Sequence, residues 1–278
     1  MITFARMGKF GRLGNQIFQY ATMVAVARKK NIKYVLPNSC IVATYDAYFN
    51  DVTKKNELGK FELFDAFKIK CPLIDDDILR RNIQANFSES SFLYDSNVWN
   101  IPNNTNLHGY YQSEKYFLEI REELLQQLSF KDEIQKAALK FLSAIDSDVK
   151  VSIHVRRGDN VAHPEVHPLS DLNYISICMN ELKKEFSNIK FVILTDDLEW
   201  CREHFEGDEF IFSENNHFTD MAIMSLCDHN IIANSSFSWW GAWLNKNENK
   251  IVYAPKIWFG PKGPPRWETI YCENWRIR

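Results

Sequence analysis

Residues 149–159 read VKVSIHVRRGD, an apolar run that ends in charged side chains. Val151, Ile153 and Val155 alternate with more polar neighbours, which is the pattern of a β-strand. Similar strands are predicted at 191–194, 210–212, 230–233 and 251–253, and apolar spacing predicts helices between them over 174–186, 198–204, 220–227 and 237–244. Helices between short apolar strands indicate a parallel sheet wound with right-handed crossovers, so we expect a Rossmann-like domain.

The first part of the chain carries another α/β pattern. A Gly-containing turn at 8–14 leads into a predicted helix over 13–30, and a short strand at 32–36 stops at Pro37. Further helices are expected over 116–128 and 132–142, whereas 42–106 shows no sustained period.

The length of 278 residues suits two domains. The sequence Asp146-Ser147-Asp148 is typical of a domain junction. It predicts an N-terminal α/β domain over 1–146 and a C-terminal Rossmann-like domain over 147–278. The last residues are candidates for packing back on the first domain.

The composition excludes several classes of protein. A formal net charge of −3 provides no basic surface for nucleic acid. No apolar run reaches the roughly eighteen residues of a membrane span, and the first residues lack the pattern of a signal peptide. The six Cys include no CxxC pair, which favours buried thiols in a reducing cytosol. We therefore expect a cytoplasmic protein, with a peripheral contact at the inner face of the membrane left open.

Three of the predicted strands end in polar clusters. These clusters are His154-Val155-Arg156-Arg157-Gly158-Asp159, Thr195-Asp196-Asp197 and Asn234-Ser235-Ser236. In a parallel sheet they share one edge, the edge at which α/β proteins bind ligands. An Arg pair and the donors at a helix start suit a diphosphate. The carboxylate of Asp196 offers two acceptor oxygens to the paired N–H donors of guanine, so the pattern predicts a guanosine diphosphate site.

Each of these features also has a simpler structural interpretation. An Arg pair is commonly salt-bridged at a surface, and Asp196 and Ser235-Ser236 are typical helix caps. The acidic sequences Asp75-Asp76-Asp77 and Asp146-x-Asp148 match the DxD pattern of metal-dependent transferases, but their positions favour helix starts or linkers, so no metal ligand is assigned. The aromatic run from Trp239 to Trp243 has helical spacing and is expected to pack a helix on the sheet.

Three sequence blocks connect the chain with a known family. The blocks are GRLGNQIFQYA at 11–21, HVRRGD at 154–159 and NSSFSWWGAWL at 234–244. In their order and spacing the chain resembles the alpha-1,2-fucosyltransferases, glycosyltransferase family 11, in the short bacterial form. The resemblance implies a GT-B fold of two facing Rossmann-like domains, GDP-beta-L-fucose as donor, and no metal or other cofactor. The chain departs from the family pattern at Arg12, where a second Gly is common, and in the stretch after Asp159.

The resemblance also implies which residues bind the donor. Arg156 would hold the beta-phosphate, with Arg157 beside it and Asp159 orienting the pair. The other donor-binding residues would be His154 and Asp196 at the guanosine end, Asn234, Ser235, Ser236 and Phe237 in the third block, and Gly14, Asn15 and Gln16, whose turn would close the pocket from the first domain.

The implied reaction is that of a galactoside 2-alpha-L-fucosyltransferase, which places fucose with inversion on O2 of a terminal beta-galactoside, here in a bacterial surface glycan such as an O-antigen. Its transition state resembles an oxocarbenium ion, and Arg156 would stabilise the leaving diphosphate. Glu165 and His167, in the loop after the Arg pair, are the candidate bases. Two alternatives stay open: a fucosyltransferase of another linkage on the same fold, and a non-catalytic protein that binds nucleotide sugars or glycans.

Overall fold

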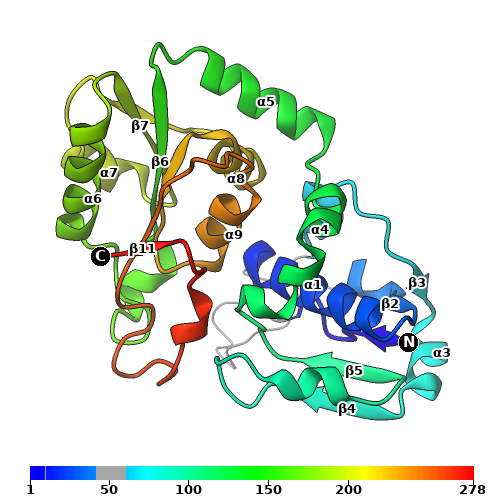
Figure 1. Ribbon diagram of the computed structural model, residues 1–278. Helices are drawn as coiled ribbons and strands as arrows, with labels where there is room; N and C mark the ends of the chain where they lie inside the picture. Colours follow the sequence, from blue (N-terminus) through cyan, green and yellow to red (C-terminus); the bar gives the residue numbers. More distant parts are fainter. Residues whose placement is uncertain (10, 42–60) are drawn as a thin grey trace. The chain divides into compact units, whose positions relative to one another are not determined.

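The computed structural model describes residues 1–9, 11–41 and 61–278. The chain divides into two compact units, Met1–Lys131 with Glu268–Ile270 and Asp132–Trp267 with Tyr271–Arg278 (Figure 1). Helix α5 (Asp132–Ser143) precedes the boundary that the sequence predicts after residue 146. It belongs to the second unit because it packs on α8 (His217–Leu226).

The first unit is built on a parallel sheet with the strand order β3-β2-β1-β5-β4. The strands are β1 (Ile2–Thr3), β2 (Tyr34–Pro37), β3 (Leu73–Ile74), β4 (Ala85–Ser88) and β5 (Thr105–His108). Helix α1 (Leu13–Lys29) is buried along most of its length and packs against β1 and β2. The other described α-helices of this unit are α2 (Leu63–Ala66), α3 (Asp76–Asn82) and α4 (Arg121–Gln127).

The second unit is built on a parallel sheet with the strand order β11-β10-β9-β6-β7-β8. Its strands are β6 (Val149–Val155), β7 (Ile189–Thr195), β8 (Phe210–Phe212), β9 (His229–Ile231), β10 (Val252–Ala254) and β11 (Arg276–Ile277). Helices α6 (Leu172–Glu185) and α7 (Leu198–His204) cover one face of the sheet, and α8 and α9 (Ser236–Leu244) cover the other (Figure 1). Both units therefore confirm the predicted α/β class.

Most of the apolar residues that were predicted to face the core of the second unit are buried in the structure. Val151, Ile153 and Val155 are fully buried against α6 and α7, as their alternation predicts. Trp239, Trp240 and Trp243 are buried as well, on the helix that covers the other face of the sheet, as the packing interpretation of the aromatic run predicts (Figure 1). All six Cys are free thiols, and five of them are buried.

The strand order of the second unit creates a position for a ligand. The chain proceeds from β6 to β7 and β8 on one side, and then returns to add β9, β10 and β11 on the other. The order reverses between β6 and β9, and α/β sheets bind ligands beyond the carboxyl ends of the strands at such a point. The Arg pair follows β6 and the third block follows β9, so both lie at this switch point.

Candidate active site

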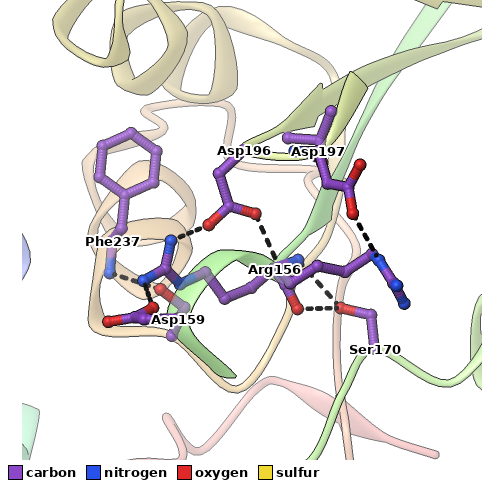
Figure 2. A network of polar contacts seen from close by, with 9 residues as sticks. Arg156, Asp159, Ser170, Asp196, Asp197 and Phe237 are labelled. Atoms are coloured by element: carbon purple, nitrogen blue, oxygen red, sulfur yellow. Dashed lines mark hydrogen bonds and ion pairs between the residues drawn. The ribbon is translucent and has the colours of Figure 1, made fainter. Parts of the chain in front are cut away.

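Arg156 is the centre of a polar network at the carboxyl end of β6 (Figure 2). Its guanidinium forms ion pairs with the carboxylates of Asp159 and Asp196, and its side chain is 18% exposed. The main-chain N–H of Arg156 donates to Ser170 Oγ at 3.0 Å. The parallel sheet thus brings the end of β6 and the end of β7 together, as the sequence predicts.

Asp196 supports the turn that follows β6. Its Oδ2 pairs with Arg156, and its Oδ1 accepts a hydrogen bond from the main-chain N–H of Arg157 at 2.9 Å. A carboxylate has about four acceptor sites, so these two bonds leave acceptor capacity. The assignment of Asp196 to guanine stays a prediction.

Arg157 and Arg156 have separate partners, since Arg156 pairs with Asp159 and Asp196 whereas Arg157 pairs with Asp197. Arg157 Nε donates to Asp197 Oδ2 at 2.9 Å, and its guanidinium carbon lies 4.0 Å from the centroid of the Trp200 ring. Asp197 in turn caps α7 by accepting from Trp200 N–H at 3.3 Å. Arg157 is thereby anchored to the start of α7, and its role toward a diphosphate stays a prediction.

Gly158 allows the chain to turn tightly beneath Asp196. Its φ is +21°, and a Cβ at this position would overlap Asp196 Oδ2. The turn returns Asp159 to Arg156, three residues earlier. The sequence contained this glycine within the second block, but its role depends on contact with the end of β7.

We expect Gly158→Ala to weaken GDP binding by at least about tenfold and to lower stability by roughly 1–3 kcal/mol, because the added methyl group must displace Asp196. GDP titration and urea unfolding measure the two effects. Gly207→Ala is the matched control: Gly207 has a φ of +116°, and among the described residues other than its two chain neighbours no heavy atom lies within 4 Å of an added Cβ. Equal GDP affinity in the two variants would contradict the role of this turn.

His154 lies at the buried end of β6, beside Arg156. Burial, and to a smaller extent the charge of Arg156, lowers the pKa of the imidazole to about 3. The ring is therefore neutral, its Nδ1 has no hydrogen-bond partner among the described residues, and its centroid lies 5.5 Å from that of Phe237. A neutral ring with one unused nitrogen is compatible with the predicted role at the guanosine end.

The side chains of Asn234 and Ser235 in the third block form structural hydrogen bonds after β9. Asn234 Nδ2 donates to the carbonyl oxygens of Pro168 at 3.0 Å and Trp258 at 3.2 Å. Ser235 caps α9, with its Oγ accepting from Phe237 N–H at 3.3 Å. Ser236 is the first residue of α9 and is half-buried. Their binding of phosphate stays a prediction, to which the helix start adds free N–H donors.

The two candidate bases lie on a loop that is tied to the segment after β10. Gly260 N–H donates to Val166 O at 3.0 Å, and Lys262 N–H donates to Glu165 O at 2.9 Å. The Glu165 carboxylate lies 3.9 Å from Lys262 Nζ. This pairing of loops has no signal in the sequence, because the partners are almost a hundred residues apart.

His167 has the more protected environment of the two. Its ring centroid lies 5.7 Å from that of Phe259, and burial lowers its pKa. The charges of Asp159, which raises the pKa, and of Arg156, which lowers it, are the next influences. The charges of Asp159 and Arg156 therefore influence the pKa of His167, and its imidazole is neutral at pH 7.

The residues of the first block that were predicted at the site lie in the first unit, at the start of α1. Gln16 is buried, with Oε1 accepting from Glu62 N–H at 2.8 Å and Nε2 donating to Gly11 O at 3.3 Å. Asn15 Oδ1 accepts from Gln112 Nε2 at 2.6 Å, and Gly14 is buried. A contact of Gly14, Asn15 or Gln16 with the donor stays a prediction.

The acidic DxD pattern at residues 75–77 has a structural role. Asp75 caps α3 by accepting from the N–H groups of Asp77 and Ile78. In residues 1–9, 11–41 and 61–278, no three His, Cys, Asp or Glu side chains are grouped to hold a metal ion. The same residues include no helix with the length and apolar character needed to cross a membrane.

Comparison with known proteins places this site in a family. The model of "Glycosyl transferase family 11" matches residues 6–277. An alpha-1,2-colitosyltransferase of Escherichia coli is 32% identical over 93% of this chain and 92% of its own length. The O-antigen biosynthesis glycosyltransferase WbnK of Escherichia coli is 26% identical over 90% and 93%, and the galactoside alpha-(1,2)-fucosyltransferase 2 of Mus musculus is 26% identical over 86% and 67%.

Solved structures show the same fold at low sequence identity. POFUT1 in its apo-form is 13% identical with a TM-score of 0.56, covering 91% of this chain and 97% of POFUT1. The fucosyltransferase NodZ from Bradyrhizobium is 13% identical with a TM-score of 0.51, covering 86% and 91%. These likenesses confirm the predicted GT-B-type architecture of two Rossmann-like units.

Proposed function

The chain belongs to glycosyltransferase family 11, and we propose that it transfers L-fucose from GDP-beta-L-fucose to O2 of a terminal beta-galactoside, with inversion and formation of an alpha-1,2 linkage. The observation that carries this proposal is the position of Arg156. Its guanidinium is held by Asp159 and Asp196 at the switch point of a parallel sheet. Relatives named alpha-1,2-fucosyltransferases supply the linkage and the class of acceptor.

In the proposed reaction, O2 of the galactoside attacks the anomeric carbon of fucose from the face opposite the diphosphate. The bond between that carbon and the beta-phosphate oxygen breaks, and its electron pair stays on the departing GDP. Arg156 stabilises the charge that develops there. His167 accepts the proton of the hydroxyl, because its burial keeps the imidazole in the neutral form that acts as a base.

The direct test is to incubate the protein with GDP-fucose and a set of simple galactosides, and to determine the linkage of each product. We expect an alpha-1,2-fucosylated beta-galactoside. Release of GDP without a fucosylated product would indicate donor hydrolysis alone. A product with another linkage would replace the proposed specificity, and binding of GDP-fucose without turnover would favour the non-catalytic alternative.

A second donor sugar is supported by the relative that is 32% identical, which is named a colitosyltransferase. Colitose is fucose without the hydroxyl group at C3. A site that hydrogen-bonds this hydroxyl discriminates strongly against a sugar that lacks it, whereas a site that packs against C3 does not. Competition between GDP-fucose and GDP-colitose at equal concentration decides which sugar this chain prefers.

Turnover is expected to survive excess EDTA. The guanidinium of Arg156 provides positive charge for the leaving diphosphate, and the best acidic pattern in the sequence is engaged in capping α3. The measurement is initial rate with EDTA, against the calcium complex of EDTA as a control for ionic effects. A loss that manganese or magnesium restores would contradict the proposed donor site.

The relative named for O-antigen biosynthesis supports a bacterial surface glycan as the acceptor. Such glycans are assembled on a lipid carrier, so we place the reaction in the cytoplasm, with a peripheral contact at the inner face of the membrane. Co-sedimentation with vesicles of anionic lipid tests that contact.

A further inference from the structure

The carboxyl edge of the first unit's sheet carries a polar network of its own. Glu89, directly after β4, accepts hydrogen bonds from the main-chain N–H groups of Tyr110 at 2.7 Å and Tyr111 at 3.0 Å. Tyr111 is buried and has a φ of +53°, which is a strained conformation for a bulky residue. The Glu89 carboxylate therefore stabilises a conformation that this segment would not favour by itself.

Gln112, the residue after Tyr111, connects this segment to the first sequence block, residues 11–21. Gln112 is only 6% exposed, and its Nε2 donates to Asn15 Oδ1 at 2.6 Å. Gly11 has a φ of +76°, and a Cβ there would overlap the Asn15 carboxamide. Asn15 is thus confined on one side by the Gly11 backbone and held on the other by Gln112.

The direction of this hydrogen bond decides what Asn15 can offer to a ligand. Because Oδ1 accepts from Gln112, the half-buried Asn15 side chain keeps its Nδ2 donors, which form no hydrogen bond with the residues that the structure describes. An amide N–H group binds an oxygen acceptor, such as a phosphate or hydroxyl oxygen. A carboxamide turned the other way would present an oxygen atom and would repel a phosphate.

We propose that Gln112 is a positioning residue that fixes the Asn15 carboxamide so that it donates to a substrate oxygen. That oxygen belongs to the diphosphate of the sugar nucleotide or to a hydroxyl group of the glycan. The inference rests on the proposed function, because it requires that the chain binds these substrates. Glu89 acts one step further away, by holding the segment that carries Gln112.

Two substitutions of Gln112 distinguish the effect of its hydrogen-bond donor from the effect of its side-chain size. Gln112→Met keeps a similar length but removes the donor, and Gln112→Glu replaces the donor with acceptors, which turns the Asn15 carboxamide round. We expect each substitution to raise the KM for either GDP-fucose or the galactoside by about 10- to 100-fold, with a smaller change in kcat. The rise should be at least as large for Gln112→Glu as for Gln112→Met. A rise in KM for GDP-fucose identifies a diphosphate oxygen as the acceptor of the Asn15 hydrogen bond. A rise in KM for the galactoside identifies a glycan hydroxyl group as that acceptor. Gln126→Met, on an exposed position of α4, is the matched control.

A double-mutant cycle with Asn15→Ala distinguishes positioning from a general loss of packing. If Gln112 acts through Asn15, Gln112→Met has no further effect on that KM in the Asn15→Ala background. Additive effects, or a KM unchanged in both Gln112 variants while thermal melting confirms folded protein, would overturn the inference. Absence of transfer by the wild-type protein would instead refute the proposed function.

Discussion

Arg156→Ala is expected to lower kcat by roughly 10²–10³, the size of effect found when a group that stabilises developing charge is removed. The guanidinium is a positive group at the switch point, and its two carboxylate partners fix its direction. Arg156→Lys should recover only part of the loss, since a compact ammonium group cannot reproduce a planar fork. Initial rates at saturating GDP-fucose measure both effects.

Two other arginines provide the comparison. Arg157→Ala should cost less turnover than Arg156→Ala, because Arg157 is engaged with Asp197 and the Trp200 ring. Arg202→Ala, at an exposed position of α7, should leave turnover within a few-fold of the wild type. An Arg156→Lys enzyme with wild-type kcat would show that the planar fork is not required.

His167→Ala is expected to lower turnover by roughly 10²–10⁴ while GDP binding is retained, as for the loss of a general base. Burial lowers the pKa of His167 below its ordinary value of 6.5, so the active, neutral form predominates at pH 7. As the pH falls through that lowered pKa, the imidazole is protonated and kcat should fall with it. The pH–rate profile of His167→Ala should lack this acidic limb.

The same loop contains the controls for this experiment. Glu165→Gln tests the other candidate base, and His163→Ala makes the same change of residue type at an exposed position. Both should stay within a few-fold of the wild type. If all three variants do so, no base from this loop is needed, and the proton is lost late to water or phosphate.

The second unit could be predicted in detail because its central strands are long and buried. The apolar alternation of β6 and the run of β7 predict both strands, and the parallel order then predicts that Arg156 and Asp196 meet. In contrast, β1, β3 and β11 contain two residues each, which is too short for any period. The strand β4 lies in the segment without a sustained period and β5 begins at its end, so both remained unpredicted.

The missed parts of the site depend on partners that are distant in sequence. Asn234 and Ser235 carry groups that can bind phosphate, and in the structure the amide of Asn234 joins two loops and Ser235 caps a helix, which residue type alone does not predict. The separate partners of Arg156 and Arg157 include Asp196, Asp197 and Trp200, about forty residues later. Residue type predicts what a side chain can bind, whereas the fold decides which partner it reaches.

Because Arg156 is paired with two carboxylates, small anions should compete poorly with GDP for binding at Arg156. One positive and two negative charges leave these three side chains with a net charge of −1. A lone sulfate or phosphate ion would have to displace a carboxylate and has no further contacts to offset that cost. A nucleotide has its base and ribose to contribute as well. When GDP departs, free phosphate therefore does not readily take its place at Arg156, which favours product release.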